Sequence, residues 1–131
     1  MDQAVDGLSY LMELKNVSKE YGQTEESISA IQDVSFALNR GEFACVVGPS
    51  GCGKSTLLKM AAGLDRPTSG EIRFCGEPVT GPHPKISMVF QSFALFPWRT
   101  VVGNVEYGLE ARGVPKAQRM DSVQKYLEMV G

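Results

Sequence analysis

The sequence predicts an α/β fold with a parallel sheet, and three adjacent features carry that prediction. Residues 42–48, EFACVVG, form a continuous apolar run, which is typical of a strand buried on both faces. A glycine-rich turn, GPSGCGKST, follows at residues 48–56. The next stretch, KSTLLKMAAGL, spaces its leucines and alanines as a helix does and meets Gly63, a typical helix stop. Strand, glycine turn and helix in this order indicate a site for a phosphate group.

Further elements are expected on both sides of this unit. Residues 11–21 alternate apolar and polar side chains, as a half-buried strand does, and residues 28–41 repeat the pattern up to a turn at Gly41. Residues 70–79 predict a strand with a turn, and residues 85–91, KISMVFQ, predict another buried strand. From Thr100 the pattern is helical, and Pro115 is placed to open a final helix whose apolar side includes Val123.

Composition limits the classes of partner. The chain has 131 residues, of which 43% are apolar, enough for one domain with its own core. Thirteen basic and fifteen acidic residues give a formal net charge of −2, and no basic stripe alternates with aromatic residues, so nucleic acid is not an expected partner. The three cysteines lack CxxC spacing and are expected to be reduced thiols of a cytoplasmic protein. No signal-peptide pattern and no apolar run of about 18 residues appears, so a membrane would be reached only through a partner.

The glycine loop, residues 48–56, fits the pattern G-x-x-x-x-G-K-[ST] at Gly48, Gly53, Lys54 and Ser55. Glycines let the backbone approach a phosphate closely, so that amide groups and the helix dipole can act on it. The lysine would supply a full charge and the serine hydroxyl a ligand for Mg²⁺. A chance match in a chain of this length has a probability of about one in a few hundred. The expected phosphate-binding residues are Gly48, Pro49, Ser50, Gly51, Cys52, Gly53, Lys54, Ser55 and Thr56.

Three separate segments resemble the ATP-binding subunits of ABC transporters. They are residues 14–22 (LKNVSKEYG), 48–72 (GPSGCGKSTLLKMAAGLDRPTSGEI) and 89–105 (VFQSFALFPWRTVVGNV). Residues 94–101 (ALFPWRTV) and 108–116 (GLEARGVPK) are similar to the importer ATPases for nitrate, sulfonate, taurine and bicarbonate. The resemblance implies a P-loop NTPase core with a parallel sheet, an N-terminal antiparallel β subdomain and the start of a helical subdomain. It places residues 1–92 in the β subdomain and core, and residues 93–131 in the Q-loop and helical subdomain.

The resemblance also assigns roles to single residues. Tyr21 would stack on the adenine ring of ATP, although an aromatic residue can also simply cap a strand end. Gln91 would act with Lys54 in catalysis and with Ser55 at Mg²⁺, although a polar residue at a strand end often just meets solvent. Cys52, close to the start of the helix, is expected to be the most readily alkylated cysteine and to be shielded by bound ATP.

A further apolar cluster is expected in a loop, at Phe93, Leu95, Phe96, Pro97 and Trp98. It either fills a core or, as the resemblance implies, forms a groove that receives a short helix of a membrane-spanning permease. The other partners implied are a second nucleotide-binding subunit, as a homodimer, and indirectly a periplasmic or lipoprotein solute-binding protein. The implied location is cytoplasmic, peripheral on the inner face of the plasma membrane.

The chain lacks several motifs that the resemblance would require: the LSGGQ signature, the Walker B strand, the D-loop and the switch histidine. We therefore expect a truncated, N-terminal half of such a domain, in which ATP binding persists and hydrolysis is doubtful. A catalytically silent nucleotide-binding fragment or interaction module is the alternative. A GTPase would show an NKxD motif, which is absent, and a P-loop kinase would not account for the segment FQSFALFPW.

Overall fold

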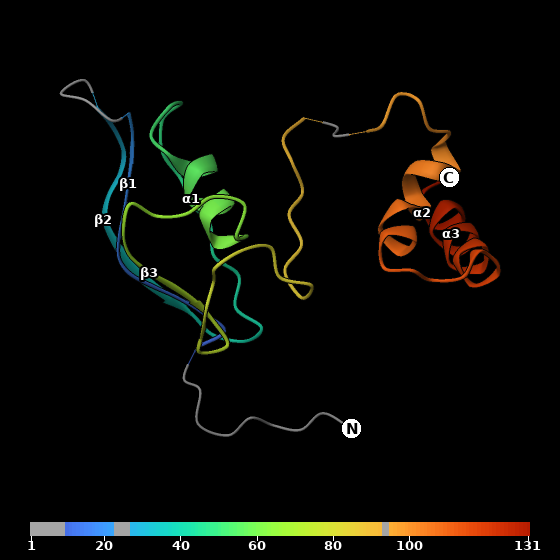
Figure 1. Cartoon of the computed structure of the whole chain (residues 1–131), viewed down its shortest axis with the longest axis horizontal. Helices are drawn as coiled ribbons and strands as arrows, with labels where there is room; N and C mark the ends of the chain where they lie inside the picture. Colours follow the sequence, from blue (N-terminus) through green and yellow to red (C-terminus); the bar gives the residue numbers. More distant parts are fainter. Residues whose placement is uncertain (1–9, 23–26, 93–94) are drawn as a thin grey trace. The chain divides into compact units, whose positions relative to one another are not determined.

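A computed structural model describes residues 10–22, 27–92 and 95–131 of the chain (Figure 1). The chain divides into two compact units, Met1–Val89 and Phe90–Gly131. The first unit holds a sheet and one helix, and the second holds a pair of helices. The domain boundary predicted between residues 92 and 93 stays a prediction.

The sheet of the first unit has four antiparallel strands in the order β2-β1-β3-β4. Strand β1 (Met12–Tyr21) pairs on one side with β2 (Ile28–Leu38) and on the other with β3 (Ser69–Phe74), which turns into the short β4 (Glu77–Pro78). These strands confirm the two predicted from alternating side chains and the strand with a turn predicted at residues 70–79. The predicted antiparallel β subdomain is therefore present.

A bulge in β1 brings two core residues onto the same face of the sheet. Leu14 and Val17 are three positions apart, which in a regular strand would place them on opposite faces. The register of β1 shifts between them, and Asn16 adopts φ 48°. Both side chains are consequently buried, at 1% and 0% exposure. The bulge is fixed by side chains of β2, because Asn16 donates its side-chain N–H to Asp33 at 2.9 Å and its backbone N–H to Ser35 at 2.8 Å.

Helix α1 (Lys54–Ala61) lies against one face of this sheet. Its two buried side chains, Leu57 and Met60, join a core made with side chains of the strands, namely Leu14, Val17, Ile31 and Ile72. Gly63, the predicted stop, follows the C-cap residue Ala62 and has φ +73°. The Gly63 N–H donates to the Met60 carbonyl at 3.0 Å and the Leu64 N–H to the Lys59 carbonyl at 2.9 Å, the pair of bonds that closes a Schellman motif. A Cβ on Gly63 would stand 2.1 Å from the Gly81 carbonyl, so no other residue fits there.

The two strands predicted as the core of a parallel sheet are not found, and this part of the predicted fold is corrected. Residues 42–48 and 85–91 are irregular and join no sheet of the described residues. Phe43, Val47 and Val89 are 93%, 82% and 96% exposed. A strand exists only when neighbouring backbones accept and donate its hydrogen bonds, and neither segment has such a neighbour among the described residues.

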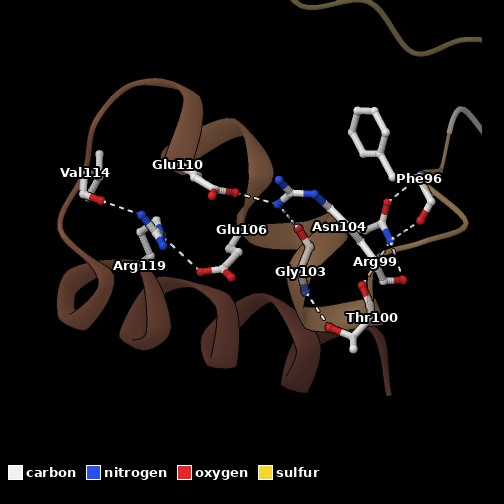
Figure 2. A network of polar contacts seen from close by, with 9 residues as sticks. All are labelled: Phe96, Arg99, Thr100, Gly103, Asn104, Glu106, Glu110, Val114 and Arg119. Carbon is white, nitrogen blue, oxygen red and sulfur yellow. Dashed lines mark hydrogen bonds and ion pairs between the residues drawn. The ribbon is translucent and has the colours of Figure 1, made fainter.

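The second unit consists of α2 (Val101–Ala111) and α3 (Lys116–Val130), both predicted. Thr100 caps α2 by accepting a hydrogen bond from the Gly103 N–H at 3.1 Å, and Pro115 precedes the first turn of α3. The helices are joined by Arg119, which pairs with Glu106 at 3.0 Å and donates to the Val114 carbonyl at 2.9 Å (Figure 2). Val123 is the buried contact of α3. None of the helices in the described ranges is long and apolar enough to cross a membrane.

Candidate nucleotide-binding site

The glycine loop leads directly into α1, and Gly53 sets the geometry of that junction. Gly53 is the N-cap of the helix, with φ 93°, a conformation that strains any residue with a side chain. A Cβ at this position would stand 2.3 Å from the Ala30 carbonyl oxygen and 2.7 Å from Ile31 Cδ1 of β2. Because glycine has no side chain to cap the helix, the first amide groups of α1 have no capping oxygen. They are left as donors for an anion.

The rest of the loop also folds tightly. Gly51 has φ +82°, and the Cys52 N–H donates to the Pro49 carbonyl at 3.4 Å. A Cβ on Gly48 would stand 2.7 Å from Cys52 Sγ, so the backbone at Gly48 lies close to the Cys52 side chain. Ser50, Cys52 and Ser55 are exposed, while Thr56 at the first turn of the helix is half-buried. The nine predicted phosphate-binding residues thus form a tight loop and the first turn of α1.

Lys54 carries the only cationic side chain of this turn. Its ammonium donates to the carbonyl oxygens of Gly48 at 2.7 Å and Pro49 at 2.6 Å, and Cys52 Sγ lies 3.6 Å away. No carboxylate forms an ion pair or hydrogen bond with it in the part of the chain that the structure describes, and α1 has no acidic residue in its first turn. A cation on the same loop as uncapped helix amides is an arrangement that attracts a polyanion. At about 4 Å and an effective dielectric near 20, one such charge pair is worth roughly 4 kcal/mol.

A pocket of about 570 Å³ lies on the sheet side of the loop. Strand β2 contributes Ile31, Val34 and Phe36 to its wall, residues 44–47 and 52–54 contribute the remainder, and Leu57 of α1 closes it. Because this lining is mostly apolar, the pocket does not suit a phosphate group. The candidate site for an anion is therefore the amide and lysine face of the loop.

Tyr21 ends β1 on the same face of the sheet as α1. Its hydroxyl donates to Asp65, four residues after the end of α1, at 2.8 Å, and its side chain is 44% exposed. Lys19, two residues earlier in β1, pairs in register with Ile31, which is the residue that the glycine loop touches at Gly53. Figure 1 shows the loop at the end of the sheet where β1 finishes and β2 begins. Tyr21 itself pairs with Ile28, three residues before Ile31 in β2.

Two residues of this region were missed in the sequence analysis, Lys19 and Asp65. The Lys19 ammonium lies 2.6 Å from Asp65 Oδ1 and 4.9 Å from the centre of the Tyr21 ring. Lys19 and, to a lesser degree, the Tyr21 hydroxyl hold the pKa of the Asp65 carboxyl below its usual range. Only the position of Lys19 two residues before Tyr21 hints at this cluster in the sequence, because Asp65 lies 44 residues further along.

The remaining predicted residues lie in the second unit or outside the described residues. Gln91 is exposed in an irregular segment, and its expected roles in catalysis and at Mg²⁺ stay predictions, as does that of Ser55. Phe93 lies outside the described residues. Leu95 and Trp98 are exposed, at 66% and 78%, whereas Phe96 packs against Tyr107 with ring centres 4.5 Å apart. The predicted apolar cluster is thus part packing and part open surface.

A glycine-capped helix with a lysine at its first position, entered from a tight loop, is the phosphate-binding element of a P-loop nucleotide-binding protein. Comparison with known proteins narrows that class. The family model described as ABC transporter matches residues 31–131. The chain belongs to the ABC transporter family.

Relatives support this assignment. The chain is 44% identical over 120 residues to the nitrate import ATP-binding protein NrtD of Synechocystis sp., covering 92% of this chain and 45% of that protein. It is 42% identical to the spermidine/putrescine import ATP-binding protein PotA of Thermobifida fusca, covering 98% of this chain and 33% of that one. The chain thus spans half or less of the length of these curated relatives.

A solved structure confirms the fold class at the level of an ATP-binding cassette. The chain is similar to the ATP-binding cassette MJ0796 in a dimeric, post-hydrolysis state bound to ADP and Pi, with a TM-score of 0.80 and 35% identity. The match covers 90% of this chain and 56% of that one. The fold is therefore that of an ATP-binding cassette, of which this chain holds part.

Proposed function

We propose that this chain is the nucleotide-binding part of an ATP-binding subunit of an ABC-type importer, in which ATP binding and hydrolysis drive solute uptake. The observation that carries the proposal is the junction of Gly53 and Lys54, where uncapped helix amides and an ammonium without a carboxylate partner meet. These hydrogen-bond donors suit the phosphates of a nucleoside triphosphate. The related cassette described as bound to ADP and Pi supports the same ligand class.

The residues of the loop would have separate roles in binding Mg·ATP. Amide groups at the start of α1 would bind the phosphates, and the Lys54 ammonium would leave the Gly48 and Pro49 carbonyls to reach them. The exposed Ser55 hydroxyl would hold Mg²⁺, which offsets phosphate charge, and Gln91 would be a further ligand and orient the attacking water. Tyr21 would stack on the adenine ring.

The solute and the partners form a finer part of the proposal. We propose uptake of a solute of the nitrate, sulfonate or taurine kind, because residues 94–101 and 108–116 resemble those importers and NrtD is a near relative. A polyamine is the competing solute, since PotA is similar to nearly the same degree. The expected partners are a permease and a second nucleotide-binding subunit, which the dimeric state of the related cassette supports. The expected location is then the cytoplasmic face of the plasma membrane.

The permease would contact the exposed side chains of Leu95 and Trp98. This segment is held firmly, because the Asn104 side chain accepts from the Phe96 N–H at 2.8 Å and donates to the Phe96 and Thr100 carbonyls at 3.2 and 3.0 Å (Figure 2). Exposed apolar side chains on a fixed loop are typical of a docking site. A short helix with an apolar face would fit it.

Binding of labelled ATP and release of phosphate, measured on the same sample, tests the proposal. Lys54→Ala removes the cation at the loop and should weaken binding of Mg·ATP by about 100-fold or more, following the size of that charge interaction. Lys59→Ala, an exposed lysine in the last turn of the same helix, is the matched control and should bind as the parent does. Equal affinities for the two variants would contradict the proposal.

A catalytically silent nucleotide-binding module is the second candidate. The same loop donors favour it, because helix amides and the Lys54 ammonium would bind phosphate whether or not hydrolysis follows. Phosphate release distinguishes the two functions. Release that depends on Lys54 supports the ATPase, whereas Lys54-dependent binding without release supports the silent module.

A further inference from the structure

The three residues Lys19, Tyr21 and Asp65 form a cluster whose arrangement goes beyond a stacking tyrosine. Both oxygens of the Asp65 carboxylate are used, because Oδ1 pairs with the Lys19 ammonium at 2.6 Å and Oδ2 accepts from the Tyr21 hydroxyl at 2.8 Å. The Arg66 N–H also donates to Oδ1 at 2.7 Å, and Lys19 donates to the Arg66 carbonyl at 2.8 Å. One carboxylate therefore fixes the lysine and the tyrosine together.

The ion pair of Lys19 and Asp65 is largely shielded from solvent, whereas the Tyr21 ring is more exposed. The side chains of Lys19 and Asp65 are only 13% and 25% exposed, while Tyr21 is 44% exposed. The Lys19 ammonium also lies 4.9 Å from the centre of the ring, so one face of the tyrosine is already occupied by a cation. The ring is held at its hydroxyl and on one face, so a ligand could stack only on its opposite face.

The open ring is also placed for a ligand that the glycine loop holds. Lys19 is opposite Ile31 in the sheet, and Ile31 Cδ1 is one of the two atoms that a Cβ on Gly53 would strike. Tyr21 is two residues further along β1, a distance of about 7 Å. A nucleotide with its phosphates on the loop would extend its base along the sheet in this range.

We propose that Asp65 is a positioning residue for the nucleotide base, acting through Tyr21. Asp65 holds the tyrosine ring with Lys19 against one face, and the base stacks on the other face. This inference rests on the proposed role of Tyr21. A ring already fixed loses little rotamer freedom when the base binds, so the cluster raises affinity for the nucleotide without touching it. The occupied hydroxyl also means that Tyr21 contributes a stacking surface and no hydrogen bond that reads the base.

Comparison of two ligands separates this role from a general effect on folding. ATP uses both the loop and the ring, whereas inorganic tripolyphosphate uses the loop alone. For the full chain, Asp65→Ala should weaken the binding of ATP about 3- to 10-fold, the range expected for one aromatic contact. The affinity for tripolyphosphate should not change. Asp65→Asn keeps an acceptor for the Tyr21 hydroxyl and should recover part of the loss. Glu71→Ala removes a carboxylate ion-paired with Arg73 on the same sheet and is the control, with neither ligand affected.

Tyr21→Ala separates failure of this inference from failure of the stacking role. This variant should weaken the binding of ATP about tenfold and leave the affinity for tripolyphosphate unchanged. The double variant with Asp65→Ala should bind ATP no more weakly than Tyr21→Ala alone. If Tyr21→Ala leaves the ratio of the two affinities unaltered, stacking is wrong and the inference falls with it. If Tyr21→Ala lowers the ratio and Asp65→Ala does not, stacking stands and the positioning role is overturned. Equal weakening of both ligands by Asp65→Ala, showing a structural role alone, overturns it as well.

Discussion

At the scale of single residues, Gly53 determines whether the glycine loop can form at all. Its φ of 93° excludes side chains by backbone strain, and the Ala30 carbonyl excludes them by contact. Gly51, in the same loop, has a similar φ of +82° but nothing within 4 Å of a Cβ. The two glycines thus share one constraint and differ in the second.

This difference predicts unequal costs for the same substitution. Gly51→Ala should lower the free energy of unfolding by about 1 kcal/mol, the strain of a left-handed residue. Gly53→Ala adds a clash with backbone and should cost about 2 to 4 kcal/mol and also reduce nucleotide affinity. Thermal unfolding of the two variants, side by side, measures the contrast. Equal costs would show that the contact with β2 does not constrain the loop.

The candidate site was predicted from the sequence only where its signal is local. All nine loop residues fall within one short motif, so their spacing alone indicated a phosphate site. The contacts of Asp65 with Lys19 and Tyr21 join residues 46 and 44 positions apart, and no pattern in one sequence reports such pairs. Cys52 and Cys45 are both exposed, so the expected selective alkylation of Cys52 remains a prediction.

At the scale of elements, the connection from α1 to β3 is fastened to β1. Asp65 binds Lys19 and Tyr21, and the Thr68 N–H donates to the Ser18 carbonyl at 2.8 Å. The Asp65 carboxylate is the acidic member of this junction, and its pKa is lowered chiefly by Lys19. The junction should therefore respond to acid.

The sign of this response follows from proton linkage. A carboxyl whose pKa is lower in the folded state binds protons more readily when unfolded, so its contribution to stability is complete above the unfolded value, about 3.9. That contribution is lost as the pH falls through the lower, folded pKa. Asp65→Asn should therefore unfold at a lower temperature than the parent at pH 7, and the gap should narrow progressively as the pH falls below about 4. Thermal unfolding across this pH range checks it, and a gap that persists unchanged in acid would contradict the assignment.

Elements defined by local patterns were predicted well, and elements defined by distant neighbours were not. The antiparallel strands have alternating side chains, and the helices carry stop and start signals such as Gly63 and Thr100. The apolar runs at residues 42–48 and 85–91 indicated burial on two faces. Burial of that kind requires partner strands, which a local pattern does not supply, and these runs are irregular here.

At the scale of the whole molecule, the two units carry different parts of the proposed function. The first holds the loop, Tyr21 and the cluster at Asp65, while the second presents Trp98 and Leu95 on a segment fixed by Asn104. In the proposed function, the first unit would supply the phosphate loop and the stacking tyrosine. The second unit would supply Gln91 and the surface that contacts a permease.

The central claim is that the backbone amides at the start of α1 bind phosphate, and nuclear magnetic resonance tests it most directly. Amide resonances of the isotope-labelled chain would be followed while Mg·ADP is added. We expect the largest shifts at residues 51–56, because their N–H groups gain charged acceptors, and we expect Lys54→Ala to reduce them. Saturating shifts confined to other parts of the chain, with residues 51–56 unmoved, would contradict the claim.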